Sequence, residues 1–94
     1  MPYKLFFKEA AKKEWDRLDT NIQKIFKKKL ASRLSKPHNK SSRLSGMKNC
    51  YKIKLRRIGY RLVYQVRDKD LVVIVVAVGK REKNFIYKKA MKRI

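Results

Sequence analysis

Apolar and basic residues alternate along residues 51–56, where the sequence reads Tyr-Lys-Ile-Lys-Leu-Arg. A period of two residues is typical of a strand whose two faces meet different surroundings. Residues 60–67 repeat the alternation, with Arg61 and Arg67 on the polar face. The two segments therefore predict a hairpin with one apolar face that packs on a core and one cationic face that points outward.

Helical spacing dominates the first part of the chain. Residues 3–7 predict a short strand, and residues 8–18 predict a helix. A second helix is expected to begin at Thr20, which has the spacing of a capping box with Gln23, and to end at Pro37. Its apolar stripe comprises Ile22, Ile25, Phe26, Leu30 and Leu34.

A polar loop over residues 36–48 precedes three predicted strands and a terminal helix. The strands span 50–56, 60–67 and 71–78, and the helix spans 85–94. The strand 71–78 is apolar on both faces, so we expect it in the centre of the sheet, ending at Gly79.

The element order β-α-α-β-β-β-α predicts an α+β fold with a mostly antiparallel sheet. Both N-terminal helices are expected to pack on one face of this sheet, while the other face is partly bare and carries the positive charge. A length of 94 residues fits a single domain over residues 1–94.

The register of the hairpin follows from the same pattern. A two-residue loop at Arg57-Ile58 pairs Lys54 with Arg61 and Arg56 with Gly59, whereas a three-residue loop would mix the two faces. Like charges directly opposite each other are unfavourable by about 0.2–1 kcal/mol. The pairing therefore indicates an anion between Lys54 and Arg61, unless both side chains extend into water.

The amino-acid composition shows that positive charge is in excess over the whole chain and not only on the hairpin. The 28 lysine and arginine residues stand against 7 aspartate and glutamate residues, a formal net charge of +21. Such an excess indicates a polyanionic partner: nucleic acid, an acidic protein or an anionic membrane surface.

The only cysteine, Cys50, excludes an internal disulfide and is expected to be a buried packing residue in a reducing compartment. The longest apolar run is too short to span a bilayer, and the N-terminus lacks the pattern of a signal peptide. The protein is therefore expected to be soluble and cytoplasmic.

The chain offers few of the usual catalytic groups. His38 is the only histidine and is expected to be a surface residue, and the carboxylates are expected to pair with lysines, cap helices or flank a turn. We therefore expect no metal site and no cofactor. Lysine, arginine and tyrosine remain, and crowded positive charges lower the pKa of both lysine and tyrosine. A basic cluster can thus activate a base and stabilise an anionic transition state for attack by the 2′-hydroxyl of RNA.

Two residues have roles that the pattern leaves open. Tyr87 lies on an apolar stripe of the terminal helix with Ala90, Met91 and Ile94, so it is either a core tyrosine with a solvated hydroxyl or a catalytic group. Arg81 follows the central strand, where it is a solvated loop charge, a partner of Glu82 or a residue that reaches the basic face.

Three motifs, taken together, resemble the RelE family of bacterial toxins. They are Cys50 to Arg56, Gly59 to Val66, and Val78 to Glu82, supported by Lys13-Glu14-Trp15 and Leu44 to Met47. The resemblance covers essentially the whole chain. It implies a compact fold like that of small microbial RNases and an endonuclease that cleaves mRNA in the ribosomal A site. It also implies an acidic antitoxin that wraps the toxin and blocks or distorts the site.

Carried over onto this sequence, the catalytic positions of the family are Lys52, Lys54, Arg61, Arg81 and Tyr87. The resemblance implies that Lys52, Lys54 and Arg61 hold the scissile phosphate. Tyr87 or a lysine takes the proton of the 2′-hydroxyl, and Arg81 supports the leaving oxygen. Contacts to RNA are expected at Lys24, Lys27, Lys28, Lys36, Arg56, Lys80 and Lys83, of which the first four would dock on ribosomal RNA. Some relatives have a basic residue where Ser45 stands.

Three other functions fit part of the pattern. A toxin of the same fold that inhibits DNA gyrase generally lacks the basic catalytic set. A non-catalytic module that binds RNA or the ribosome explains the charge but not the positions of Lys54, Arg61, Arg81 and Tyr87. A protein that binds anionic membranes would partition onto liposomes whatever the salt concentration.

Overall fold

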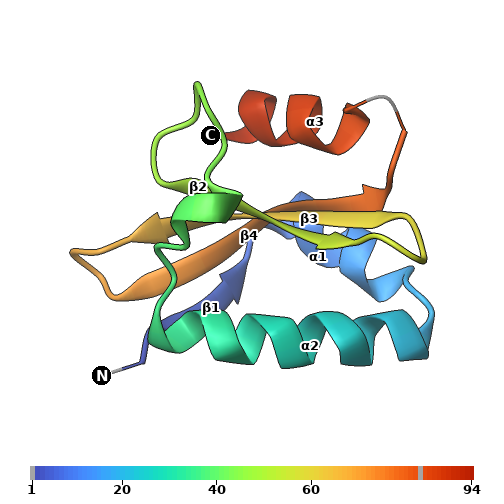
Figure 1. The fold of residues 1–94 in the computed structure, drawn as a ribbon, viewed down its shortest axis with the longest axis horizontal. Helices are drawn as coiled ribbons and strands as arrows, with labels where there is room; N and C mark the ends of the chain where they lie inside the picture. The colour runs from blue at the N-terminus through green and yellow to red at the C-terminus, as the bar shows by residue number, and fades with distance from the viewer. Residues whose placement is uncertain (1, 83) are drawn as a thin grey trace.

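Strands and helices follow one another in the predicted order in the computed structural model, which describes residues 2–82 and 84–94 (Figure 1). The RNA contact predicted at Lys83 lies outside the described residues. The elements are β1 (Lys4–Phe7), α1 (Glu9–Asp16), α2 (Thr20–Ser35), the 3-10 helix η1 (Lys40–Ser42), β2 (Cys50–Leu55), β3 (Tyr60–Arg67), β4 (Val72–Lys80) and α3 (Phe85–Arg93). The prediction of an α+β fold is confirmed.

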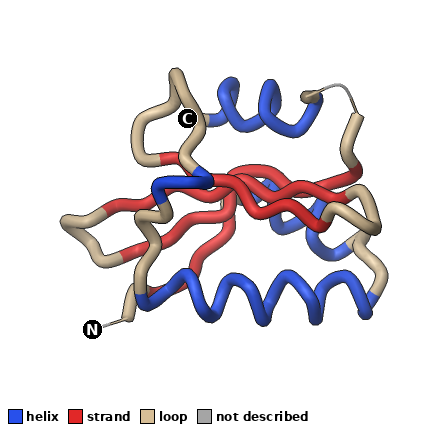
Figure 2. The backbone as a smooth tube through the Cα atoms, viewed as in Figure 1, coloured by secondary structure: helices blue, strands red, loops and turns tan. Residues whose placement is uncertain are grey.

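The four strands form one sheet in the order β1-β4-β3-β2 (Figure 2). β4 runs parallel to β1 and antiparallel to β3, which in turn is antiparallel to β2. β4 therefore lies in the interior of the sheet, as its apolar sequence predicted, and the sheet is mostly antiparallel.

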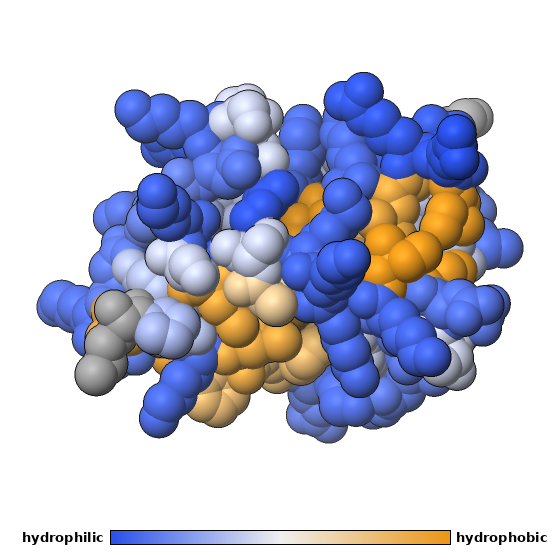
Figure 3. All heavy atoms as spheres, turned by 60° about the horizontal axis from the view of Figure 1, so that its bottom comes forward, coloured by the Kyte–Doolittle hydropathy of each residue, from blue (hydrophilic) through white to orange (hydrophobic). Residues whose placement is uncertain are grey.

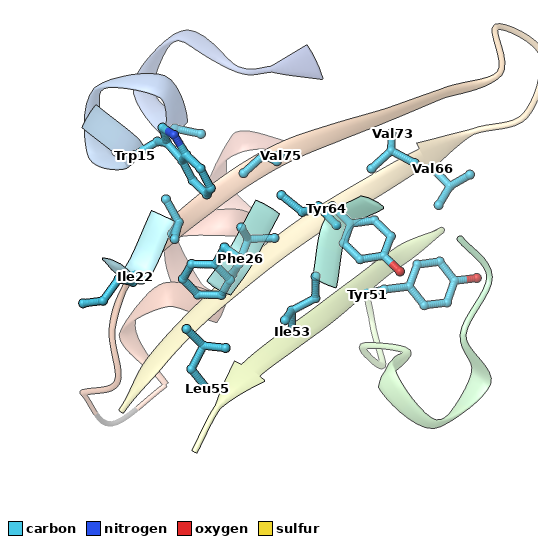
Figure 4. Close-up of a cluster of buried hydrophobic side chains, with 14 residues drawn as sticks. Trp15, Ile22, Phe26, Tyr51, Ile53, Leu55, Tyr64, Val66, Val73 and Val75 are labelled. Carbon is cyan, nitrogen blue, oxygen red and sulfur yellow. The ribbon is translucent and has the colours of Figure 1, made fainter. Parts of the chain in front are cut away.

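Helices α1 and α2 both pack on one face of the sheet, which confirms this part of the prediction. The core here is rich in aromatic rings: the ring centroid of Trp15 lies 5.2 Å from that of Phe7 and 6.1 Å from that of Phe26. Figure 4 shows Trp15 and Phe26 within the buried cluster. The apolar side chains of the hairpin, Ile53 and Leu55 among them, complete the cluster. Burial of these large rings is a main source of stability for a chain of this size.

The opposite face of the sheet is covered in part by α3, which the sequence pattern did not place there (Figure 1). The same face carries the half-buried Lys52 and Lys54 on the hairpin. A second buried cluster fills the space between this face, α3 and the loop before β2. It comprises Leu44, Met47, Cys50, Val63, Val76, Ala77, Ile86 and Ala90. The cause is the apolar sequence of β4, because a strand that is apolar on both faces needs cover on both.

A bulge in β4 distributes its valines between the two cores. Tyr64 pairs with Val75 and Val63 pairs with Ala77, so Val76 is an extra residue between them. The strand then continues through Gly79 to Lys80, and the prediction that Gly79 ends it is wrong. A side chain at Gly79 would place its Cβ 2.9 Å from the Cδ1 atom of Ile86. Glycine at this position therefore lets α3 approach the strand closely.

The hairpin has the predicted register, since Lys54 pairs with Arg61. Its turn is longer than expected and comprises residues 56–59, so the pairing of Arg56 with Gly59 is wrong. Gly59 has a φ of +74° and donates its N–H to the Leu55 carbonyl at 2.8 Å. This left-handed conformation favours glycine and tightens the turn.

The start of α2 also differs from the prediction. The N-cap is Asp19, whose carboxylate accepts a hydrogen bond from the Asn21 N–H at 3.4 Å. Gln23 donates its side-chain amide to the Trp15 carbonyl at 2.8 Å, so the capping box expected with Thr20 is wrong. Ile25, which the pattern assigned to the apolar stripe, is 38% exposed.

Candidate active site

Four cationic side chains gather on the β2–β3 hairpin. Lys52 and Lys54 lie on β2, Arg61 lies opposite Lys54 on β3, and Arg56 lies in the turn. The positive charge of Lys52 lowers the pKa of Lys54, with further lowering from desolvation and from the charges of Arg61 and Arg56. The four residues therefore act on one another electrostatically, and Lys54 loses its proton more readily than an isolated lysine.

Arg61 is buried and only 7% exposed, so the expectation that it faces solvent is wrong. Its guanidinium donates to the Tyr60 carbonyl at 2.9 Å. Among residues 2–82 and 84–94, no carboxylate forms an ion pair with it. A buried cation without a counter-ion is costly. An anionic ligand would supply the missing partner.

Arg81 lies just beyond β4, beside the hairpin turn. Its backbone N–H donates to the Gly59 carbonyl at 2.6 Å, and its side chain is exposed. The turn, the end of β4 and the start of α3 lie at the same end of the sheet (Figure 1). The loop that carries Arg81 is thus tied to the hairpin that carries Arg61.

Tyr87 projects from α3 toward the second core cluster. Its ring packs against this cluster, which includes Val63, the residue that pairs with Lys52 across the hairpin. Its hydroxyl is buried and has no hydrogen-bond partner within the described part of the chain, so the alternative of a core tyrosine with a solvated hydroxyl is wrong in that the hydroxyl is not solvated. Buried hydroxyls are nearly always hydrogen-bonded, and exceptions concentrate at functional sites.

The predicted RNA contacts lie on two surfaces. Lys24, Lys27 and Lys28 are exposed along α2, and Lys36 is exposed at its C-cap. Arg56 and Lys80 are exposed at the end of the sheet near Arg81. Hydrophilic side chains cover most of the face shown in Figure 3, with apolar areas between them.

A shallow basin of about 360 Å³ adjoins the hairpin and contains residues that sequence reasoning missed. It is lined by Arg33, Ser41, Ser42, Lys52, Lys54 and Arg56. Arg33 donates to the Tyr64 hydroxyl at 2.9 Å and to the Ser42 hydroxyl at 3.3 Å. The loop after α2 folds back over the edge of β2 and brings the serines there, a long-range contact that no local pattern signals.

His38 forms hydrogen bonds between two parts of the fold, and Cys50 lies in the core. Nδ1 of His38 lies 2.7 Å from the Tyr51 hydroxyl, and Nε2 lies 2.7 Å from Oδ1 of Asp68, so the exposed ring bridges the start of β2 and the turn after β3. Cys50 is fully buried, as expected, and burial raises the pKa of its thiol. The described residues contain no cluster of histidine, cysteine or carboxylate side chains that would hold a metal ion. None of the described helices is long and apolar enough to cross a membrane.

Comparison with known proteins identifies the class to which this fold and cationic site belong. Residues 5–85 match the family model of the ParE toxin of the type II toxin–antitoxin system parDE. The chain therefore belongs to the RelE/ParE family of toxins from type II toxin–antitoxin systems.

Within this family, the chain is similar to RelE proteins over its full length. It is 52% identical to a putative RelE-like toxin protein of Escherichia coli and 51% identical to the mRNA interferase toxin RelE of Escherichia coli strain K12. Both matches cover 100% of this chain and 99% of the relative. The resemblance to the RelE family that the motifs indicated is confirmed.

Solved structures agree with this assignment. An Escherichia coli RelE variant with two arginines replaced by alanine, in the free state, has a TM-score of 0.92 at 50% identity and covers 100% of this chain and 99% of its own. RelE in the intact Escherichia coli RelBE toxin–antitoxin complex has a TM-score of 0.83 at 51% identity and covers 86% of this chain and 99% of its own.

Proposed function

We propose that this protein is the toxin of a type II toxin–antitoxin pair and an mRNA interferase that cleaves mRNA in the ribosomal A site. The observation that carries this proposal is the 51% identity, over the full chain, to the mRNA interferase toxin RelE. Residues 1–94 form one functional domain that acts in the cytoplasm and inhibits translation. The protein needs neither a metal ion nor another cofactor.

The cationic cluster supports a specific division of labour. Lys52, Lys54 and Arg61 bind the scissile phosphate and stabilise the charge that develops on it. The 2′-oxygen attacks phosphorus, the bond from phosphorus to the 5′-oxygen breaks, and the products are a 2′,3′-cyclic phosphate and a 5′-hydroxyl. Arg81 stabilises the charge on the departing 5′-oxygen.

Two groups are candidates for the general base that takes the proton from the 2′-hydroxyl. The pKa of Lys54 is lowered, first by the charge of Lys52, so Lys54 becomes a neutral amine more readily than an isolated lysine does. Tyr87 has a buried hydroxyl without a hydrogen-bond partner, which could take part once a local movement exposes it to the substrate. Whichever group takes this proton becomes an acid, and it can then supply a proton to the leaving oxygen.

The same charges account for two macromolecular partners. The lysines of α2 bind ribosomal RNA phosphates and orient the toxin in the A site. The cognate antitoxin is an acidic, RelB-like protein, an inference supported by the RelBE complex of the similar Escherichia coli toxin. Its negative charge complements the net charge of +21.

The test is primer extension on one mRNA held on purified ribosomes with an empty A site, beside the same mRNA free in solution. We expect cleavage within the A-site codon on ribosomes only. The Arg81→Ala variant should bind ribosomes normally and cleave about 100-fold more slowly, because one charge-stabilising group is removed. Arg67→Ala is the matched control, since Arg67 is exposed at the opposite end of β3.

Other outcomes would contradict this function. Equal cleavage of free mRNA would indicate a general ribonuclease, and full activity of Arg81→Ala would remove that residue from the site. The match to the ParE model favours gyrase inhibition as the second candidate function. A toxin that leaves both RNAs intact but blocks DNA supercoiling would establish that alternative.

A further inference from the structure

Two side chains take the place of a neighbouring strand along part of β4. β1 pairs with β4 only over Val72–Val75, which leaves the following stretch without a strand on that side. There the Val78 N–H donates to Oε1 of Glu14 at 3.2 Å, and Nη1 of Arg93 donates to the Val76 carbonyl at 2.9 Å. Backbone groups of an interior strand need such partners, and Glu14 and Arg93 supply them.

The same two side chains form a bidentate ion pair. Nη1 of Arg93 lies 2.9 Å from Oε1 of Glu14, and Nη2 lies 3.0 Å from Oε2. Lys89 adds a third contact, with Nζ 2.8 Å from Oε2. The Glu14 side chain is only 14% exposed. Planar, double contacts of this kind fix orientation as well as distance.

Hydrogen bonding outweighs burial at this carboxylate. Burial acts to raise the pKa of Glu14, but the hydrogen bonds from Arg93, Lys89 and the Val78 N–H lower it below its ordinary value. Lys8 ties the same end of α3, since its Nζ donates to the Arg93 carbonyl at 2.8 Å. Glu14 is therefore ionised at neutral pH, and both of its carboxylate oxygens accept hydrogen bonds.

The contacts of Glu14 join β4, which leads into the loop that carries Arg81, to α3, which carries Tyr87. Glu14 belongs to α1, on one face of the sheet, whereas Arg93 and Lys89 belong to α3, on the other. Val78 on β4 lies three residues before Arg81, and Lys89 lies two residues after Tyr87 on α3. One carboxylate thus reaches around the edge of β4 and sets α3 against the strand.

We propose that Glu14 is a positioning residue for the reaction: through Arg93, Lys89 and the Val78 amide it holds Tyr87 in register with Arg81. The inference rests on the proposed function. α3 has nine residues, from Phe85 to Arg93, and helices of this length are not stable alone in water. Its position depends on its contacts with the second core cluster and on this clamp of Glu14, Lys89 and Arg93.

The experiment compares Glu14→Gln with Asp16→Asn. Each variant neutralises one carboxylate on α1, but Asp16 is exposed and pairs with Lys12, at 2.6 Å, within the same helix. Single-turnover cleavage of ribosome-bound mRNA is measured over a range of toxin concentrations, at a temperature at which melting curves show every variant folded. For Glu14→Gln we expect the maximal rate to fall about 10- to 100-fold with an unchanged half-saturating concentration. Asp16→Asn should match the wild type.

Hydrogen exchange of the α3 amides supplies a readout that does not depend on cleavage. We expect faster exchange in α3 for Glu14→Gln and no change for Asp16→Asn. Arg93→Lys keeps the charge but cannot make the double contact, so its maximal rate should fall as well. Glutamine retains an acceptor for the Val78 N–H, so the Glu14→Gln variant is expected to fold.

Other results would contradict either the positioning role of Glu14 or the proposed function. A folded Glu14→Gln variant with the wild-type maximal rate, or with unchanged exchange in α3, refutes the positioning role. A rate that falls only in proportion to the unfolded fraction refutes it too. If the wild type itself fails to cleave, the proposed function is wrong, and the exchange data still decide whether Glu14 holds α3.

Discussion

At the scale of single residues, the site is built from groups that lack ordinary partners. Arg61 is a buried cation that donates to a neutral carbonyl, and Tyr87 has a buried hydroxyl with no acceptor or donor among the described residues. Lys54 faces Arg61 across the hairpin, a like-charge pair that costs stability. These features disfavour the folded protein by itself and favour a bound anion, which is typical of functional sites.

The Tyr87→Phe variant tests whether the hydroxyl takes part in chemistry. Removing a buried hydroxyl without a partner should leave the melting temperature unchanged or slightly raised, because no hydrogen bond is broken. Cleavage on ribosomes should fall about 100-fold or more if the hydroxyl transfers a proton. The measurements are single-turnover cleavage and thermal unfolding of the same preparation. Wild-type cleavage by this variant would make Tyr87 a packing residue and leave Lys54 as the base.

At the scale of helices and strands, the sequence predicted what depends on local pattern. Alternation along residues 51–56 and 60–67 set the register that places Lys54 opposite Arg61. The bulge at Val76 was missed because an unbroken apolar run contains no alternation to interrupt. The cover of the second face was missed for another reason: an apolar stripe on a helix does not indicate which face of the sheet that helix will pack against.

Glu14 illustrates the same limit for the candidate site. Within its own helix, a nearby lysine is the ordinary partner for a glutamate, and this was the expectation. Its actual partners, Lys89 and Arg93, lie at the other end of the chain. The presence of Arg33 and Ser42 in the basin beside the hairpin was also not predicted, because the path of the loop after α2 has no local sequence signature.

The clamp predicts a pH dependence of stability. The folded-state pKa of Glu14 is lowered, so its stabilising effect is present above the unfolded value of about 4.3 and disappears as pH falls through the folded-state pKa. Denaturant unfolding of the wild type and Glu14→Gln should therefore differ most at neutral pH and converge in acid. Asp16→Asn controls for removal of a carboxylate from the same helix. A constant difference between wild type and Glu14→Gln from neutral pH into strong acid would contradict the ionised clamp.

At the scale of the whole molecule, charge links the site to its partners. A net charge of +21 disfavours self-association and promotes rapid encounter with polyanions. The hairpin and the exposed face of α2 both carry part of this charge. An acidic antitoxin and ribosomal RNA therefore compete for one protein through the same long-range attraction, and shape decides where each of them binds.

Salt dependence of ribosome binding tests the role of α2. Each lysine that neutralises a phosphate releases condensed counterions, so the logarithm of affinity falls linearly with the logarithm of salt concentration. Replacing Lys24, Lys27 and Lys28 by glutamine should reduce the magnitude of that slope by about 3, roughly one unit for each phosphate that is no longer neutralised. Filter binding or sedimentation with ribosomes at several salt concentrations gives the slope.

The matched control replaces three other exposed lysines, Lys69, Lys88 and Lys92, which lie away from α2. Both triple variants have the same net charge, so an effect of overall charge alone would change the two slopes equally. A slope reduced only by the α2 substitutions assigns the docking surface to that helix, because counterion release depends on charges that touch phosphates. A slope that neither variant changes would contradict docking through α2 and would leave the hairpin as the main contact with ribosomal RNA.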